Sequence, residues 1–380
     1  MIMNKPGPKF TLGVEEEYLL VDRETRGLVV DPPESLMKAC EELCGGQVTS
    51  ELLRSQIEIA TKVCNNVQEV REELRRLRKI IVDVANDHGF APIAASTHPF
   101  SSWVDQKQTP KDRYEALTLE MQAAARRLLI CGMHVHVGID DDELRIDLMN
   151  QMSYFLPHLL ALSCSSPFWE GRDTGLKSYR LTVFDALPRT GIPERFASYS
   201  EYLRHVYILV NAGLIEDSTR IWWDLRPSAR YPTLETRVMD VCTRLDDTVA
   251  LAAMLVCIMR MLCRLRSANQ RWRIYTPMLI RENRWRAMRY SFDEGLIDFA
   301  KGTVVPFDEL LEEMLSVIAE DAEALGCTEE VESVRDILAR GTSAHRQLKS
   351  FESSQASGAS TEEALHAVVD TLIEDTAAGL

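Results

Sequence analysis

The sequence predicts an α+β protein built on an antiparallel β-sheet. Segments with the two-residue alternation of strands and segments with the spacing of amphipathic helices do not follow one another regularly, as they would in a doubly wound parallel sheet. The strand patterns end near Met239, and the chain after Asp246 is mostly helical in pattern. Hydrophobic residues make up 46% of the 380 residues, which is enough for a sizeable core.

Strands are expected in the first two thirds of the chain. Phe10–Asp22 alternates apolar and polar residues, and a charged turn and a short strand over Leu28–Val30 follow it. Together these segments predict a hairpin near the N-terminus. The other predicted strands are Gln56–Ala60, Phe90–Ala95, Ile130–Ile139, Trp222–Arg226 and Thr233–Met239.

Helices are expected between and after these strands. Apolar residues from Val67 to Val84 recur at helical spacing, and Asn66 followed by Glu69 provides a capping start. A second helix is expected over Asp142–Leu162, with a bend at Pro157. The later predicted helices are Asp246–Ser267, Asp308–Leu325, Thr328–Arg340 and a short C-terminal helix capped by Ser360 and Glu363.

The segment Ser163–Phe196 is rich in glycine, proline and serine, which predicts a long functional loop rather than regular structure. The longest apolar run, Val249–Met259, is too short to span a bilayer and is flanked by charged residues. It predicts a buried helix. The helix that carries this run could belong to the core or to a homodimer interface.

Charge and cysteine content exclude several classes of protein. A formal net charge of −15 argues against nucleic acid or an anionic membrane surface as the main partner. The nine cysteines are irregularly spaced and form no CxxC pair, which is typical of reduced thiols and not of a zinc ribbon. Residues Met1–Lys9 contain no apolar signal core. These features predict a cytoplasmic protein.

The first candidate site is the acidic run within the first strand. Alternation places Glu15 and Glu17 on one face and Glu16 on the opposite face with Val14 and Tyr18. Two neighbouring carboxylates repel each other and resist ionisation, and a hard divalent cation relieves that cost. The alternative interpretation is an exposed acidic face.

Two further strands carry side chains of the same kind. In Gln56–Ala60, Glu58 points away from the apolar face, and Glu51, seven residues earlier, could reach the same cavity through a bend. In the run from Gly132 to Gly138, His134 and His136 share one face of an apolar strand, which indicates a ligand or phosphate site. A solvated strand face and buried structural histidines are the respective alternatives. The absence of an HExxH motif argues against a zinc hydrolase.

The predicted loop and the last strand supply basic side chains. Serines and glycines from Ser163 to Ser178 permit close approach of an anionic ligand, whose carboxylate Arg180 or Arg172 could bind. A plain surface loop is the alternative, and the absence of a Walker lysine motif excludes a P-loop. Glu235 and Arg237 share one strand face. They form either a salt bridge or a metal-binding glutamate beside an arginine that stabilises a phosphoryl group in transfer.

These motifs together resemble a known family. GVEEEYLLVD, SQIEIATKVC, CGMHVHVGI, ALSCSSPFWEGRDTG, WWDLRPS and TLETRVMD occur in this order, and they are similar to the motifs of glutamate–cysteine ligase type 2, or the carboxylate–amine ligase family. The similarity runs from Phe10 to Arg346. It implies a glutamine-synthetase-like catalytic fold, in which an antiparallel sheet forms a half-open cavity with helices packed outside. We expect one catalytic domain over residues 1–349, and a polar linker with a short helix over residues 350–380.

The resemblance also implies roles for individual residues and implies that ATP and Mg²⁺, with Mn²⁺ as an alternative, are the cofactors. The implied catalytic residues are Arg180, which would hold the substrate carboxylate, and Arg237, which would contact the transferring phosphoryl group. His134 and Arg237 would contact the nucleotide, and His136 would support that site indirectly. The implied metal ligands are Glu15, Glu17, Glu51, Glu58, His134 and Glu235.

The reaction implied by the resemblance is ATP-dependent joining of small molecules. ATP would phosphorylate the γ-carboxylate of L-glutamate, and the amine of L-cysteine would displace phosphate to give γ-glutamylcysteine, a step of glutathione biosynthesis. Another amine acceptor, a guanidino-type kinase reaction and a non-catalytic paralogue that binds metal or nucleotide are the alternatives.

Overall fold

A seven-stranded antiparallel sheet runs through the centre of the computed structural model, which describes residues 8–380. The strand order is β10–β11–β5–β1–β3–β2, and β4 also pairs with β1. This arrangement confirms the predicted antiparallel α+β class. The strands of the sheet are β1 (Leu12–Asp22), β2 (Val48–Ser50), β3 (Gln56–Ala60), β4 (Phe90–Ile93), β5 (Met133–Gly138), β10 (Leu225–Pro227) and β11 (Thr233–Thr236). Most of the N-terminal segment in which no signal core was expected lies outside the described residues.

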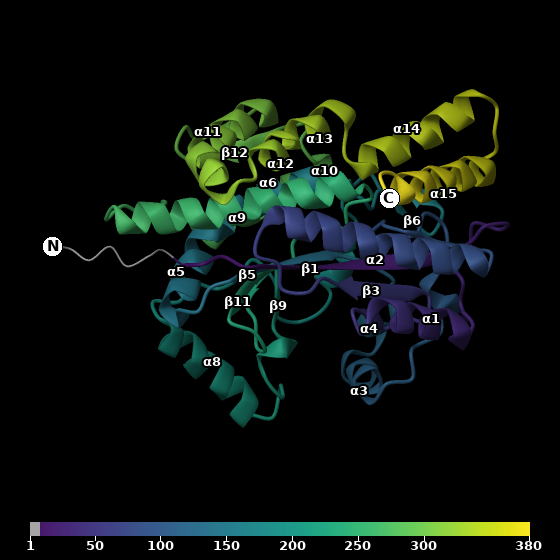
Figure 1. Ribbon diagram of the computed structural model, residues 1–380, viewed down its shortest axis with the longest axis horizontal. Coiled ribbons are helices and arrows are strands. Elements are labelled where there is room, and N and C mark those ends of the chain that lie inside the picture. Colours follow the sequence, from purple (N-terminus) through teal and green to yellow (C-terminus); the bar gives the residue numbers. More distant parts are fainter. Residues whose placement is uncertain (1–7) are drawn as a thin grey trace.

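Helices α2 (Val67–Asp87) and α9 (Leu245–Ser267) run along one face of the sheet (Figure 1). From Leu12 to Tyr18, alternation along β1 buries every second side chain on this face, as predicted, and the residues from Tyr18 to Val21 are all buried. Glu16 is one of these, and its carboxylate accepts hydrogen bonds from Arg78 Nε at 2.9 Å and Nη2 at 2.6 Å. Although α9 is long and apolar enough to cross a membrane, most of it is buried inside the protein. It therefore belongs to the core.

Further helices surround this central unit (Figure 1). In this view, α6 and the later helices α10 to α13 lie above α9, and α1, α3, α4 and α8 lie on the other side of the sheet. The remaining helices are α1 (Glu34–Cys44), α3 (Asp112–Met121), α4 (Ala123–Arg126), α5 (Asp142–Met152), α6 (Leu156–Ser163), α7 (Arg180–Phe184), α8 (Tyr199–Asn211), α10 (Pro277–Tyr290), α11 (Phe307–Leu325), α12 (Thr328–Glu332), α13 (Val334–Arg340), α14 (Ser343–Ala356) and α15 (Thr361–Ala377). Short elements are the 3₁₀ helices η1 (Trp103–Asp105), η2 (Ser153–Phe155) and η3 (Ser218–Arg220), and the strands β6 (Phe168–Trp169), β7 (Arg172–Asp173), β8 (Thr190–Gly191), β9 (Trp222–Trp223), β12 (Leu296–Asp298) and β13 (Thr303–Val305).

Several expected elements differ in the structure. Leu28–Val30 is not a strand, because only Leu28 bridges to Val21. Pro157 does not bend a continuous helix: α5 ends at Met152, and the proline occupies the first turn of α6, where its missing N–H costs nothing. The segment Ser163–Phe196 is not wholly irregular, since it contains β6, β7, α7 and β8.

The C-terminal segment is more ordered than expected. In place of a polar linker from residue 350, α14 continues to Ala356, and α15 is 17 residues long. Ser360 and Glu363 form the predicted capping box. The two helices pack side by side (Figure 1), and α15 also contacts β4. The boundary expected at residue 349 therefore falls inside a helix.

Candidate active site

The pairing of the strands aligns the candidate side chains across the sheet. Three pairs lie directly opposite each other in register: Glu15 with His134, Glu17 with Glu58, and Glu235 with His136. Residues that are opposite in neighbouring antiparallel strands project from the same face. Because Glu16 points toward α2 on the other face, the aligned side chains project away from that helix.

These side chains border one cavity of about 520 Å³. The sheet forms its floor, α3 contributes Arg113 and Tyr114, α7 contributes Arg180, and the segment around β9 contributes Trp222. All nine residues to which the resemblance assigned a role line this cavity, namely Glu15, Glu17, Glu51, Glu58, His134, His136, Arg180, Glu235 and Arg237. Sequence reasoning missed the contribution of α3.

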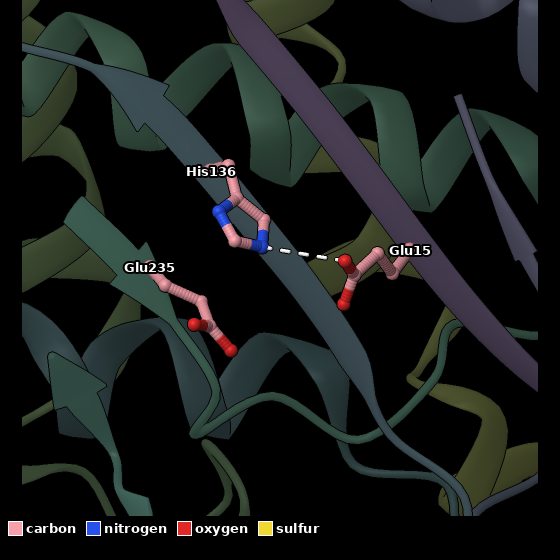
Figure 2. A group of neighbouring side chains, drawn as sticks. All are labelled: Glu15, His136 and Glu235. Carbon is pink, nitrogen blue, oxygen red and sulfur yellow. Dashed lines mark ion pairs between the residues drawn. The ribbon is translucent and has the colours of Figure 1, made fainter. Parts of the chain in front are cut away.

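Glu15, His136 and Glu235 come from three neighbouring strands and point toward one another (Figure 2). One ligand atom from each lies within 4.8 Å of the others. Glu15 accepts from His134 Nδ1 at 3.1 Å and lies 3.4 Å from His136 Nε2. Burial alone would raise the pKa of Glu15, but its contacts with the two histidines hold this pKa well below its usual range. The resemblance implied His134 as the metal ligand, whereas the geometry groups His136 with the two carboxylates.

A second acidic group consists of Glu17, Glu51 and Glu58. Burial, with the charge of Glu51, raises the pKa of Glu17 to about 7 even though the amide of Gly132 donates to it at 2.7 Å. Burial and the neighbouring carboxylates raise the pKa of Glu58 well above its usual range. Carboxylates that oppose one another's ionisation form the oxygen-rich donor set that hard divalent cations bind. The residues therefore fit Mg²⁺.

Two arginines hold Glu235. Arg226 donates from Nε at 2.9 Å and from Nη2 at 3.2 Å, and Arg237 forms an ion pair with the same carboxylate. These two positive charges outweigh the effect of burial and keep the pKa of Glu235 well below its usual range. Arg226 had no role in the sequence interpretation. Its position directly opposite Glu235 in the ladder explains the contact, and that register is not visible in a single strand.

Arg180 lies at the start of α7, buried beside Gly132. A Cβ atom at Gly132 would lie 2.3 Å from Nη2 of Arg180, so the absence of a side chain makes room for the guanidinium group. Nη2 donates to the carbonyl of Arg237 at 3.2 Å, and Nη1 has no hydrogen-bond partner among the described residues. Arg172, the alternative carboxylate-binding residue, is exposed and does not line the cavity.

The serine-rich motif does not border the cavity. Ser165, Ser166 and Ser178 are fully buried and donate hydrogen bonds to the buried carboxylate of Asp240. These serines therefore do not offer the close approach to a ligand in the cavity that the sequence suggested, and they are not part of a plain surface loop either. They have a structural role instead.

The chain matches the model of glutamate–cysteine ligase family 2 over residues 11–370. It belongs to this family. Curated relatives provisionally named glutamate–cysteine ligase 2 include one from Rhodospirillum rubrum, 60% identical over 98% of this chain and 97% of its own length, and one from Jannaschia sp., 54% identical over 96% of both. Family membership makes the chain an ATP-dependent ligase that forms a carbon–nitrogen bond, as predicted.

Solved structures share the fold. The glutamate–cysteine ligase from Francisella tularensis in complex with AMP superimposes with a TM-score of 0.68 at 13% identity, over 97% of this chain and 89% of that one. A bifunctional glutathione synthetase from Pasteurella multocida gives a TM-score of 0.68 at 15% identity, over 97% of this chain and 52% of that one. At these identities the likeness concerns the fold alone.

Proposed function

We propose that this ligase joins the γ-carboxylate of L-glutamate to the amino group of L-cysteine with consumption of ATP. The observation that carries the proposal is the convergence of acidic, histidine and arginine side chains on one face of the sheet, within a single cavity of about 520 Å³. Family membership supplies the reaction class. The names of the relatives support glutamate and cysteine as substrates.

The acidic groups would hold Mg²⁺. Glu15, His136 and Glu235 form one donor set, and Glu17, Glu51 and Glu58 form another. Bound Mg²⁺ supplies positive charge that screens the phosphates of ATP. A chain with a net charge of −15 would otherwise repel the nucleotide.

The arginines act on the reacting groups. A carboxylate is too electron-rich for direct attack by an amine, so its oxygen first takes the γ-phosphoryl group of ATP to form an acyl phosphate. Arg237, ion-paired with Glu235 and lining the cavity, would stabilise the charge on that phosphoryl group. Arg180 would bind a carboxylate of the acid substrate. The amine then attacks the acyl carbon, and inorganic phosphate leaves with the electron pair of the broken C–O bond. The proton that the amine nitrogen loses ends on the released phosphate or in solvent.

An assay of ATP conversion to ADP across a panel of carboxylic acids and amines, with products identified by mass spectrometry, tests the proposal. We expect γ-glutamylcysteine, ADP and free phosphate in the presence of Mg²⁺. If the assay gave a different amide product, the protein would still be a ligase, but its amine substrate would not be L-cysteine. A stable phosphorylated guanidino product would indicate a kinase instead, and the absence of ATP consumption with every pair would contradict the proposal.

A further inference from the structure

We propose that Asp240 is a positioning residue for Arg180 and that it acts through the hydroxyl group of Ser166. The inference rests on the proposed function, in which Arg180 binds the acid substrate. Asp240 is fully buried. Its Oδ2 accepts from the amide of Ser165 at 2.9 Å and from Ser166 Oγ at 2.7 Å, and its Oδ1 accepts from Ser178 Oγ at 2.9 Å. All three partners donate hydrogen bonds, so position 240 requires a side chain that only accepts them.

Ser166 connects this carboxylate to the arginine. A hydroxyl group carries one hydrogen, which Ser166 donates to Asp240, and a lone pair therefore remains for the amide of Arg180, which donates to Ser166 Oγ at 3.1 Å. The carboxylate thus fixes the orientation of the hydroxyl. The hydroxyl in turn fixes the backbone at the residue from which the Arg180 side chain extends.

The other end of α7 is held as well. Asp185, which follows the helix, accepts from Arg284 Nη1 at 2.7 Å and Nη2 at 2.8 Å, and Arg284 Nε donates to Asp224 at 2.6 Å. A helix of five residues has too few internal hydrogen bonds to be stable alone. Contacts with the rest of the protein therefore determine where α7 lies. At its start, the carbonyl of Ser166 accepts from the amide of Tyr179 at 2.9 Å, and the hydroxyl of Ser166, held by Asp240, accepts from the amide of Arg180.

The place of the Arg180 guanidinium group depends on the position of the α7 backbone. Arg180 Nη2 donates to the carbonyl of Arg237 at 3.2 Å, and the guanidinium group fits over Gly132, where even a Cβ atom would collide with it. A small displacement of the α7 backbone would therefore lose this fit. A positioning role explains why the serine motif is buried behind the cavity and does not line it.

Two matched variants test the proposal. Ser166→Ala and Ser178→Ala each remove one fully buried hydroxyl that donates to Asp240, but only Ser166 also accepts from the amide of Arg180. We expect Ser166→Ala to raise the KM for L-glutamate about tenfold, and Ser178→Ala to change it by less than about twofold. The KM for Mg–ATP should stay within about twofold in both variants. Both should lose thermal stability, and Ser166→Ala should lose more because it also leaves the amide of Arg180 without an acceptor.

Crystal structures of the two variants give a second readout that does not need activity. The guanidinium group of Arg180 should be displaced in Ser166→Ala and should remain over Gly132 in Ser178→Ala. Equal KM values for glutamate in the two variants, or an unmoved Arg180 in Ser166→Ala, would overturn the inference. A wild-type enzyme that makes no product from glutamate would contradict the proposed function instead, and the crystal structures would still decide whether the Ser166 hydroxyl that Asp240 holds positions Arg180.

Discussion

Three consecutive glutamates of β1 have three different environments. Glu15 is held ionised by two histidines, Glu16 is ion-paired with Arg78 on the opposite face of the sheet, and Glu17 has a pKa raised to about 7. Strand alternation separates Glu16 from its neighbours. The distinct behaviour of Glu15 and Glu17 arises from the strands beside them, because β5 places histidines next to Glu15 and β3 places Glu58 next to Glu17.

Replacing Glu58 by glutamine should abolish activity and stabilise the metal-free protein. The pKa of Glu58 is raised well above its usual range in the folded state, so this carboxylate lowers stability once the pH exceeds its unfolded pKa. At pH 7 to 8 without Mg²⁺, we expect Glu58→Gln to increase the free energy of unfolding by about 1 kcal/mol or more, with the gain vanishing toward pH 4. Product formation should fall by at least about 100-fold. Chemical denaturation and the ADP assay measure the two effects.

The control for this prediction is Glu42→Gln, which makes the same chemical change at an exposed position of α1. It should change neither the free energy of unfolding nor the rate of product formation measurably. If Glu58→Gln retained full turnover, this carboxylate would have no part in the site.

Mg²⁺ binding should release protons near neutral pH. Glu17, with a pKa of about 7, is about half protonated at pH 7 in the metal-free protein, and a cation binds only the deprotonated form. We expect release of at least about half a proton at pH 7, with Glu58 adding to it, and an apparent Mg²⁺ affinity that increases from pH 6 to pH 8. Calorimetric titrations in buffers of different ionisation enthalpy measure this release. Binding heats that are independent of the buffer would contradict the prediction.

At the scale of elements, sequence patterns located most helices and strands but not their interruptions. Asn66 accepts from the amide of Glu69 and caps α2 as predicted, since capping depends on residues three positions apart. The helix expected over Thr328–Arg340 is two helices, α12 and α13, that meet at Ser333. Thr233–Met239 is strand only as far as Thr236, because the next residue, Arg237, donates its amide to Asp224 and leaves the ladder.

Helix α10 should contribute to stability through Arg284. This residue is largely buried and pairs with Asp224, whose side chain is only 1% exposed. Arg284→Met should destabilise the protein by roughly 3–5 kcal/mol, because it leaves a buried carboxylate without a partner. Urea denaturation measures this loss. Arg281→Met, on the same helix but exposed, should change stability by less than about 0.5 kcal/mol, and equal losses in the two variants would contradict the assignment.

At the scale of the whole molecule, the C-terminal pair of helices is part of the structural unit that carries the site. The hydroxyl of Thr376 accepts a hydrogen bond at 3.0 Å from the amide of Ala94, the residue directly after β4. Asp375 forms ion pairs with Arg244 and Arg346. The buried side chains of α15 include Leu365, Val368, Val369 and Leu372. Because β4 pairs with β1, these contacts support the strand that carries the candidate ligands.

A chain that ends at Ser350 should therefore fail to fold. Each buried aliphatic side chain of α15 contributes about 1.5–3 kcal/mol, so their sum is comparable to the roughly 5–15 kcal/mol by which folded domains are stable. A chain that ends at Ala377 keeps α15 complete and should behave like the full-length protein. Yield of soluble protein and circular dichroism measure the difference. A folded and active chain ending at Ser350 would show that residues 351–380 are dispensable.

The sequence by itself determined the sheet class, the family and the side chains that share a strand face, because alternation and motif order are local properties of the chain. Only the tertiary structure decided which faces meet. The grouping of His136 with Glu15 and Glu235, the contact of Arg226 with Glu235 and the use of the serine motif to hold Asp240 all depend on strand register and on contacts between distant segments. Such contacts join residues that are far apart in the sequence, so they form only when the chain folds. The pattern of residues within one segment therefore cannot predict them.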